Sequence, residues 1–493
     1  MNSASAELPS RHGRANTAKS FVRQFGLAAL LSVAVCSVYA CGSTDSEQAE
    51  RPNVLLYISD TLRADGLGCY GNEVVETPNL DRFAEEGVLY ERAYAPSSWT
   101  RASMGSILTG TAPAVHGAEG RYDLLADSAV MISELFASEG YRVGSITTNR
   151  NVGSFFGFDQ GFGAGDFIEL YEESREERVS VEELTTLADD VTARAIAWMS
   201  ASDEPFCLIV HTIDPHSPYM PPASWDRYGE GIESGVDGSQ KSLYKLKTER
   251  DAADEARVVS LYYGEIAFND YAFGELIEWM RERGSLERTV VAFTSDHGEE
   301  FWERGERGHG KTLNEKALHV PLILRYPAAF SSGSRDSNPV STLDLLPTLL
   351  ELAKIDVPSQ VEGSSLTAAN AREDALVFSS CKLSELELYS AQDANWKLVF
   401  DARTGKKKLF DLREDEAKQR DVFAKNREVG RELFRALTKS LEAQARKRVE
   451  LYGTSQPLRV DELTEEVRSD LEELGYLGDP MDYEEDAAGT EED

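Results

Sequence analysis

Cysteine is scarce in this chain, which has five among its 493 residues. Two of them, Cys36 and Cys41, lie in the amino-terminal leader, and the others are Cys69, Cys207 and Cys381. An odd set of three without a Cys-x-x-Cys pair excludes a disulfide framework and a cysteine metal site. We therefore expect three buried thiols.

Positive charge is also in short supply. The chain has 51 Lys and Arg against 86 Asp and Glu, which gives a formal net charge of −35. A surface this acidic argues against nucleic acid as a partner. It would also repel anionic substrates, so an anion site must bring its own positive charge from a metal ion or from Arg, Lys and His.

The leader has no apolar run long enough to read as a membrane span. Its run Phe25–Ala40 is short, is interrupted by Ser and Gly and follows several basic residues, a pattern that predicts a signal peptide over 1–40. The run ends in VYACGS (38–43), which resembles a bacterial lipobox with Cys41 as the lipidated first residue of the mature chain. The alternative is an ordinary signal peptide cleaved near the same point. We expect an exported protein, periplasmic or anchored to the membrane as a cell-envelope lipoprotein.

Beyond a polar linker at 41–51, short apolar runs alternate with amphipathic segments. This alternation predicts an α/β fold over 52–370, with a mainly parallel central sheet sandwiched by helices. From about residue 371 the pattern favours a small α+β subdomain (371–478), followed by an acidic tail at 479–493 that we expect to be disordered. The predicted strands are 53–59, 141–147, 206–212, 290–295, 321–325, 375–379, 396–401 and 409–411, and the predicted helices are 77–90, 128–139, 180–201, 255–283 and 424–447, with a surface loop or lid at 224–254.

The stretch 97–110, SSWTRASMGSILTG, reads as a loop that turns into a helix. Thr100 stands at the start of that helix, where backbone N–H groups are free and the helix dipole is positive. A hydroxyl there can attack or hold an anionic ester. The alternative is that Thr100 is only an N-cap.

Polar side chains follow four of the predicted strands. In a parallel sheet such strand ends share one edge, where ligands bind. An Asp there is often only a helix cap, and His211 could be a core histidine, but four such ends are harder to explain in this way because the chain has only seven histidines. Carboxylates with an imidazole suit a divalent cation such as Mg²⁺, Mn²⁺, Ca²⁺ or Zn²⁺. The four groups are Asp60 with Arg63, His211 with Asp214 and His216, Asp296 with His297, and His309 with Lys311.

Taken together, these stretches resemble the sulfatase family, within the alkaline-phosphatase superfamily. The resemblance covers nearly all of 52–478 and rests on the order of several motifs, so it implies the fold of that superfamily. The motifs are NVLLYISDTLRADGLGCYG (53–71), TPNLDRFAEEGVLYERAYA (77–95), the stretch 97–110 followed by His116-Gly117, GFDQGF (157–162), DPHSPYMPP (214–222), FTSDHGEEFWERG (293–305), HVPLILRYP (319–327), WKLVFD…LFDL (396–412) and EELGYLG (472–478).

The resemblance also implies a role for each matched residue. Asp60, Asp296 and His297 would hold one divalent metal ion at the nucleophile, and the imidazole favours Mn²⁺ or Zn²⁺ over Ca²⁺. Whether Asp214 is a second metal ligand stays open. The remaining roles are leaving-group protonation by His216, a place beside the nucleophile for His116, and substrate contacts from Arg63, His211, His309 and Lys311, with packing as the alternative for Arg63.

The sequence departs from the family pattern at its nucleophile. The resemblance places a Cys or Ser there, oxidised to formylglycine, with an Arg four residues later, whereas this chain has Thr100 and Met104. We therefore expect no formylglycine. Arg101 is out of register for the family's Arg, and we expect it to pair with the substrate anion. A metal-activated threonine remains a workable nucleophile.

Three functions remain in competition. The first is a hydrolase of a small, glycan or lipid anionic ester, with phosphate mono- or diesters favoured over sulfate because water can attack a phospho-threonine at phosphorus. The second is a transferase of phosphoglycerol or phosphoethanolamine groups, although such enzymes usually carry several membrane helices. The third is a non-catalytic binding protein on a sulfatase-like scaffold, which the retained acids speak against because buried acids are costly without a metal.

Overall fold

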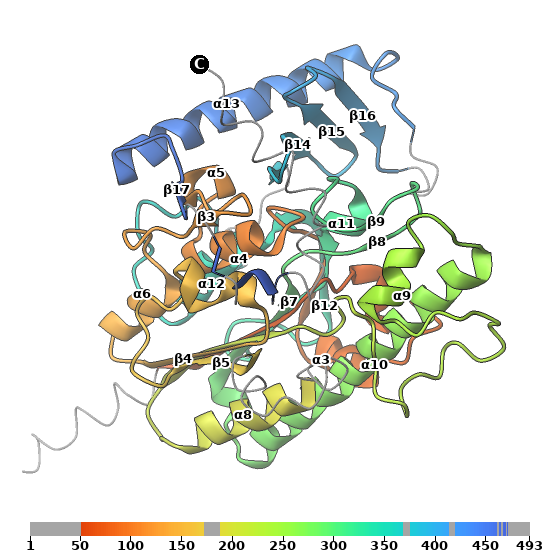
Figure 1. Cartoon of the computed structure of the whole chain (residues 1–493). Helices are drawn as coiled ribbons and strands as arrows, with labels where there is room; N and C mark the ends of the chain where they lie inside the picture. Colours follow the sequence, from red (N-terminus) through yellow and green to blue (C-terminus); the bar gives the residue numbers. More distant parts are fainter. Residues whose placement is uncertain are drawn as a thin grey trace, which may run out of the picture. The chain divides into compact units, whose positions relative to one another are not determined.

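In the computed structural model (Figure 1), the described residues are 51–171, 188–367, 375–413 and 420–460, together with 463–464, 467–469 and 471. Several expectations lie outside them: the signal peptide, lipidation at Cys41, the first part of the helix expected at 180–201, and the acidic tail. None of the described helices combines the length and the apolar character that a membrane crossing needs.

A nine-stranded sheet organises residues 52–367. Its order is β10-β2-β11-β7-β1-β6-β4-β5, and β12 also pairs with β2. The pairs around β1, β4 and β6 and between β12 and β2 are parallel, whereas β11 runs antiparallel to both β2 and β7. The prediction of a mainly parallel sheet is therefore confirmed. The strands are β1 (Asn53–Ser59), β2 (Val88–Tyr94), β4 (Arg142–Thr147), β5 (Phe167–Glu169), β6 (Phe206–Thr212), β7 (Thr289–Ser295), β10 (His319–Val320), β11 (Leu322–Arg325) and β12 (Ser334–Ser341).

The central strands are continuous apolar runs because both faces of the sheet are covered. Side chains along β1 alternate between two cores. Leu56 and Ile58 belong to the core on one face, while Leu55 and Tyr57 belong to the core on the other. A run such as NVLLYIS is therefore fully buried without being helical.

Helices pack on both faces of this sheet, as predicted. In the view of Figure 1, α3, α8 and α10 lie below the sheet, and α4, α6 and α12 lie above it. The helix predicted at 77–90 ends at Glu86, and Gly87 then leads into β2. The helices are α3 (Pro78–Glu86), α4 (Thr100–Thr109), α5 (Pro113–His116), α6 (Ile132–Ser138), α8 (Ala188–Ser200), α9 (Gln240–Lys245), α10 (Ala252–Glu282), α11 (Glu315–Leu318) and α12 (Leu345–Leu352), with 3₁₀ turns at Ala64–Gly66, Gly68–Tyr70, Arg150–Val152, Ser154–Phe156, Leu286–Arg288 and Thr342–Asp344.

The carboxyl-terminal part is a second, antiparallel sheet covered by one long helix. Its strands are β13 (Val377–Cys381), β14 (Leu388–Gln392), β15 (Trp396–Asp401) and β16 (Lys407–Asp411), in that order. Helix α13 (Arg427–Tyr452) packs on it through Leu433 and Leu437. The predicted hairpin is confirmed as the β15–β16 pair. Short pairs elsewhere join β3 (Asp123–Leu124) to β17 (Leu458–Arg459) and β8 (Glu300–Phe301) to β9 (Arg307–Gly308).

Several contacts join this second sheet to the part of the chain that forms the first sheet, and two of them lie next to α4 and α11. The segment before α4 bridges β13, because the Ser380 N–H donates to the Pro96 carbonyl (2.9 Å) and Ser97 forms a bridge with Ser380. In addition, Lys397 on β15 and Glu315 on α11 form a buried ion pair with a separation of 2.7 Å. The segment before α4 and the helix α11 therefore both pack against the carboxyl-terminal sheet.

The sequence missed several elements, among them β12, β14, α9 and α12. Strand β12 reads SRDSNPVS, which is polar and contains Pro339, because this strand pairs only with β2 at the edge of the sheet. The three cysteines outside the leader are free thiols. Cys207 and Cys381 are buried, as expected, and Cys69 is partly buried.

Candidate active site

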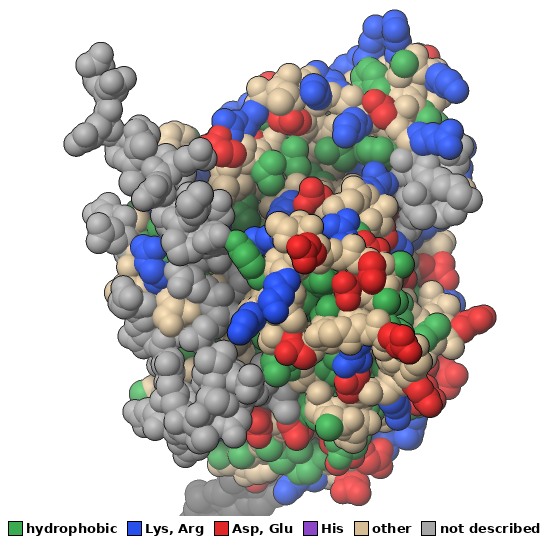
Figure 2. Space-filling view, turned by 45° about the vertical axis from the view of Figure 1, so that its right-hand side comes forward, with side chains coloured by type: hydrophobic (Ala, Val, Ile, Leu, Met, Phe, Trp, Pro, Cys, Tyr) green, Lys and Arg blue, Asp and Glu red, His purple; other side chains and the backbone are tan. Residues whose placement is uncertain are grey.

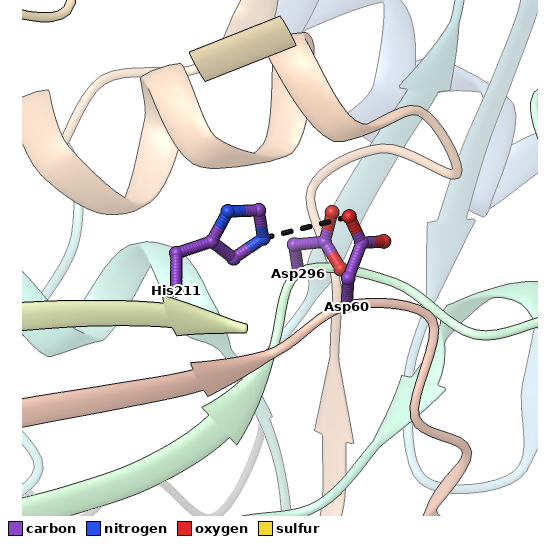
Figure 3. Close-up of side chains that lie close together, drawn as sticks. All are labelled: Asp60, His211 and Asp296. Carbon is purple, nitrogen blue, oxygen red and sulfur yellow. Dashed lines mark ion pairs between the residues drawn. The ribbon is translucent and has the colours of Figure 1, made fainter. Parts of the chain in front are cut away.

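Three strands of the central sheet deliver one cluster of side chains at their carboxyl ends. Asp60 follows β1, His211 lies near the end of β6, and Asp296 follows β7. One potential ligand atom of each lies within 4.8 Å of the others (Figure 3), and all three side chains are buried. The parallel register puts Ser59 opposite both Thr212 and Ser295, so the polar residues meet at one edge.

The two carboxylates each use one oxygen within the protein. Asp60 Oδ2 accepts a hydrogen bond from Asn149 Nδ2 (2.6 Å), and Asp296 Oδ1 accepts from the N–H groups of Thr61 (3.2 Å) and His297 (2.8 Å). Burial and the neighbouring Asp296 carboxylate raise the pKa of Asp60 well above its ordinary value. Two acids buried this close together need a cation to balance them.

The residues present fit a divalent cation. Among the described residues, Asp60 Oδ1, Asp296 Oδ2 and His211 Nε2 have no hydrogen-bond partner, although all three are buried. Buried polar atoms are seldom left unsatisfied, and two carboxylate oxygens with an imidazole nitrogen match the donor preference of divalent metal ions. The structure thus adds His211, expected as a substrate contact, to the candidate metal ligands.

Thr100 is the first residue of α4, and its N-cap is Trp99. The interpretation of Thr100 as a simple N-cap is therefore wrong. Its hydroxyl Oγ1 lies 3.0 Å from Nε2 of His297, the residue next to Asp296. Nδ1 of His297 donates to the Gly298 carbonyl (2.9 Å), which leaves Nε2 as the accepting nitrogen. Burial also lowers the pKa of His297, which favours the neutral ring.

His216 and His309 complete a group of three neighbouring imidazoles. The His309 ring centroid lies 4.5 Å from that of His297 and 5.0 Å from that of His216. Nδ1 of His216 donates to the Ser217 carbonyl, so its Nε2 is the nitrogen that can exchange a proton with a ligand. His309 Nδ1 pairs with Glu299 Oε1 at a distance of 3.2 Å. Burial alone would raise the pKa of Glu299, but His309 outweighs it and the pKa falls to about 2.

His116 lies behind α4 and supports it from the side opposite the cluster residues. Its Nε2 lies 3.1 Å from both the Ala102 carbonyl and Ser106 Oγ, and its Nδ1 accepts from the Ala118 N–H (3.1 Å). Burial lowers the pKa of His116 to about 3, so the ring is neutral. Both ring nitrogens are committed, which makes His116 a support for the helix that carries Thr100.

Three residues expected to bind substrate have other partners. Arg63 forms ion pairs with Asp65 and Glu303, so the packing alternative holds for it. The Arg101 guanidinium is buried and donates to backbone carbonyls, which corrects the expectation that it pairs with substrate. Lys311 is exposed and its Nζ donates to the Arg307 carbonyl at 3.3 Å. Of His309 and Lys311, His309 is the one that lies beside His297, the partner of Thr100.

The acidic balance of the sequence is visible on the surface. In Figure 2, Asp and Glu side chains spread over the middle and lower parts of the face, and Lys and Arg gather near its top. Asp214 lies outside the group formed by Asp60, His211 and Asp296. Its backbone carbonyl accepts from Ser59 Oγ (2.8 Å) and Asn269 Nδ2 (2.6 Å) and so holds the loop that carries His216.

Comparison with known proteins agrees with this geometry. The family model described as "Sulfatase" matches residues 52–355, and the model "N-sulphoglucosamine sulphohydrolase, C-terminal" matches residues 305–447. The chain belongs to the sulfatase family. The prediction of a sulfatase-like ester hydrolase is thereby confirmed.

Relatives and structural neighbours of this sulfatase-family chain include enzymes of two kinds. It is 24% identical over 419 residues to the N-acetylglucosamine-6-O-sulfatase of Bacteroides thetaiotaomicron, covering 68% of this chain and 74% of the relative. It is 26% identical over 374 residues to the arylsulfatase of Clostridium perfringens, covering 64% and 78%. Its fold matches the phosphonate monoester hydrolase of Silicibacter pomeroyi with a TM-score of 0.68 and 21% identity, over 80% of this chain and 96% of the other.

The sequence did not predict three residues that lie in or next to the candidate active site. Asn149 follows β4 and Glu299 follows His297 by two residues, so the rule that polar residues gather at strand ends would have found both. Thr61 carries a stronger signal, visible only in the structure. Its φ is +59°, unusual for a β-branched residue, and Tyr262 OH holds its carbonyl at 2.9 Å.

Proposed function

We propose that this chain is a metal-dependent hydrolase that cleaves a phosphate mono- or diester through a covalent intermediate on Thr100. The observation that carries the proposal is the 3.0 Å contact between Thr100 Oγ1 and His297 Nε2, beside two buried carboxylates and at the first residue of a helix. The free N–H groups and dipole of that helix end suit an anionic ester.

The nucleophile favours phosphorus over sulfur. A threonine cannot become formylglycine, so the intermediate would be an ordinary ester of its hydroxyl. Water can attack a phospho-threonine at phosphorus, whereas a sulfo-threonine lacks the exit that a formylglycine hydrate provides. The similarity of the fold to a phosphonate monoester hydrolase supports this preference. The sulfate ester remains the second candidate because the curated relatives bear sulfatase names.

The proposed division of labour follows the geometry. Asp60, Asp296 and His211 would hold the metal ion. His297, expected as a ligand, has its one lone pair on Nε2, and the Thr100 hydroxyl donates to it. When bound, such an ion lowers the pKa of a hydroxyl that contacts it and stabilises charge on the transferring group. His297 Nε2 accepts the hydrogen bond of the Thr100 hydroxyl and so directs its oxygen.

The substrate side of the site belongs to two other histidines. His309 would bind the anionic oxygens of the ester, because Glu299 fixes its ring from the Nδ1 side. Burial, with His309 beside it, lowers the pKa of His216 and keeps the free ring neutral, with its proton on Nδ1. When the anionic ester binds, His216 would take up a solvent proton on Nε2 and give it to the leaving group. Glycan or lipid anionic esters are the proposed substrates, and the leader supports export and anchoring through Cys41 as part of the same proposal.

The test is a turnover assay of the purified mature chain with Mn²⁺. Aryl phosphomonoesters, phosphodiesters, phosphonate monoesters and sulfates are compared for the wild type, Thr100→Ala and Asp296→Ala. We expect a phosphate or phosphonate ester to be cleaved fastest, and both variants to lose turnover. Equal turnover by all three proteins overturns the proposal. A sulfate ester cleaved fastest, again only with Thr100 present, replaces it with the second candidate.

A further inference from the structure

Arg101 is the residue next to Thr100, and its side chain lies entirely inside the protein. Its guanidinium donates to the carbonyls of Gly120 (2.9 Å) and Arg121 (2.6 Å) and to Asn151 Oδ1 (2.7 Å). Its Cζ also lies 3.3 Å from the centroid of the Phe156 ring. One planar fork therefore joins the start of α4 to a loop and to the turn that follows β4.

A line of hydrogen bonds leads from Arg101 to the candidate metal site. Asn151, which accepts from Arg101, donates its own backbone N–H to Asn149 Oδ1 (2.9 Å). Asn149 then donates Nδ2 to Asp60 Oδ2 (2.6 Å). All four residues of this line are at least 95% buried, so water does not compete for these bonds.

The hydrogen bond from the Asn151 backbone N–H fixes the orientation of the Asn149 side-chain amide. Because a backbone N–H can only donate, it settles which end of the Asn149 amide is oxygen and turns the NH₂ group toward Asp60. That NH₂ group occupies Asp60 Oδ2 and leaves Asp60 Oδ1 as the oxygen without a partner among the described residues. The orientation of the Asp60 carboxylate thus depends on the position of the turn at 149–151.

We propose that Arg101 is a positioning residue that orients the metal ligand Asp60 through Asn151 and Asn149. It does so from the residue next to the nucleophile, so one side chain sets the place of Thr100 relative to Asp60. The proposal rests on the metal-dependent function proposed above. Outer partners of metal ligands typically change metal affinity by roughly 10- to 100-fold when they are removed.

A purely structural role for Arg101 makes a different prediction. If Arg101 only filled the core, its loss would lower stability. Any change in Mn²⁺ affinity would then be the same whether or not Asn149 is present. A double-mutant cycle separates the two cases, because a residue that acts through Asn149 has no further effect once Asn149 is gone. Arg325 provides the control, since it is also a buried arginine but lies on β11, where it is ion-paired with Glu86 and Glu287.

The experiment titrates Mn²⁺ into the metal-free mature chain by calorimetry and follows urea unfolding of the same proteins. We expect Asn149→Ala to weaken Mn²⁺ binding by roughly 10- to 100-fold and Arg101→Met by roughly tenfold. The double variant should bind Mn²⁺ as Asn149→Ala does. Arg325→Met should unfold at lower urea and bind Mn²⁺ as the wild type does.

Two further variants guard against a misfolded Arg101→Met. Arg101→Lys keeps the charge but loses the fork, and Asn151→Ala leaves Arg101 in place while removing its acceptor, so both should weaken Mn²⁺ binding. Unchanged Mn²⁺ affinity in these variants, or a loss on Arg101 substitution that persists in full without Asn149, overturns the proposal. A wild type that binds no Mn²⁺ overturns the proposed function itself, and this proposal with it.

Discussion

Thr100 and His297 come from elements almost two hundred residues apart in the chain, yet Thr100 Oγ1 lies 3.0 Å from His297 Nε2. Ser103, one turn along the same helix, donates its Oγ to the Asp296 carbonyl (2.5 Å) and holds α4 against the end of β7. The hydroxyl is thus placed by two contacts between the same elements, and its chemistry can be tested by changing one oxygen.

Replacing Thr100 by Ala should lower kcat by roughly 10⁴-fold or more, because the group that forms the covalent intermediate is gone. Thr100→Ser keeps the hydroxyl and should retain most of the activity. The measurement is kcat on an aryl phosphodiester with Mn²⁺, together with mass spectrometry of Thr100 in acid-quenched reactions. Thr109→Ala, in the last turn of the same helix, should leave kcat unchanged. Wild-type kcat in Thr100→Ala would contradict a threonine nucleophile.

His211 and His297 should differ in what their loss does at saturating metal. His297 contacts the Thr100 hydroxyl, so His297→Ala should lower kcat about a hundredfold or more even when Mn²⁺ is in excess. His211→Ala should weaken Mn²⁺ binding, because Nε2 of His211 lies 3.6 Å from Asp60 Oδ2, and excess Mn²⁺ should restore much of its kcat. His319→Ala serves as control, since that ring bonds the Glu91 carbonyl. Equal kcat for the first two variants at saturating Mn²⁺ would refute this assignment.

Asp214 should make the metal-free protein less stable as pH rises. Burial raises the pKa of Asp214 to about 7, whereas in the unfolded chain it ionises near pH 4. Between these values the unfolded state has released a proton that the folded state still holds. The free energy of unfolding therefore falls across this window, by roughly 4 kcal/mol at most.

Urea unfolding at about pH 5 and about pH 8 checks this expectation. Asp214→Asn cannot ionise and should lose less stability than the wild type between the two. Asp226→Asn is the control, because hydrogen bonding to Arg257 lowers the pKa of Asp226 and its effect falls below the window. Parallel curves for the wild type and Asp214→Asn would rule out a raised pKa at Asp214.

The buried pair of Lys397 and Glu315 should be costly to break on one side only. Lys397→Met leaves a carboxylate that is 5% exposed without its partner and should lower the free energy of unfolding by about 3–5 kcal/mol. Adding Glu315→Leu should recover most of that loss. The measurement is urea unfolding, with Arg446→Met of an exposed pair as control, expected to change stability by less than about 1 kcal/mol. A double variant no more stable than Lys397→Met would show that packing, not charge, carries the contact.

The parts of the fold that the sequence predicted share one physical reason. Runs such as NVLLYIS are buried on both faces, so their apolar character is continuous and the polar residue that follows each run marks the sheet edge. For this reason the sequence alone predicts that Asp60 and Asp296 lie at the same edge of the sheet. Edge strand β12 and strand β14 of the second sheet lack that pattern, because polar residues interrupt the apolar ones in SRDSNPVS and LYSAQ.

The partners of the Arg101 and Arg63 side chains were harder to predict, for a different reason. A motif fixes where a backbone goes, but the direction of a long side chain depends on partners from elsewhere in the chain. Arg101 turns inward because the carbonyls of 120–121 and Asn151 surround it, and Arg63 is drawn to Asp65 and Glu303. The partners of Arg101 lie 19 to 50 residues away in the sequence, too far for spacing to predict them.

The bridge between Ser97 and Ser380 also constrains how this protein can be rebuilt. Because β13 pairs with the segment just before Thr100, the carboxyl-terminal sheet is part of the wall that holds the proposed nucleophile. A chimera that exchanged this sheet for that of another family member would transplant a piece of the catalytic loop's support along with it. Swaps of substrate preference in this scaffold therefore have to move 95–100 and 377–381 together as one unit.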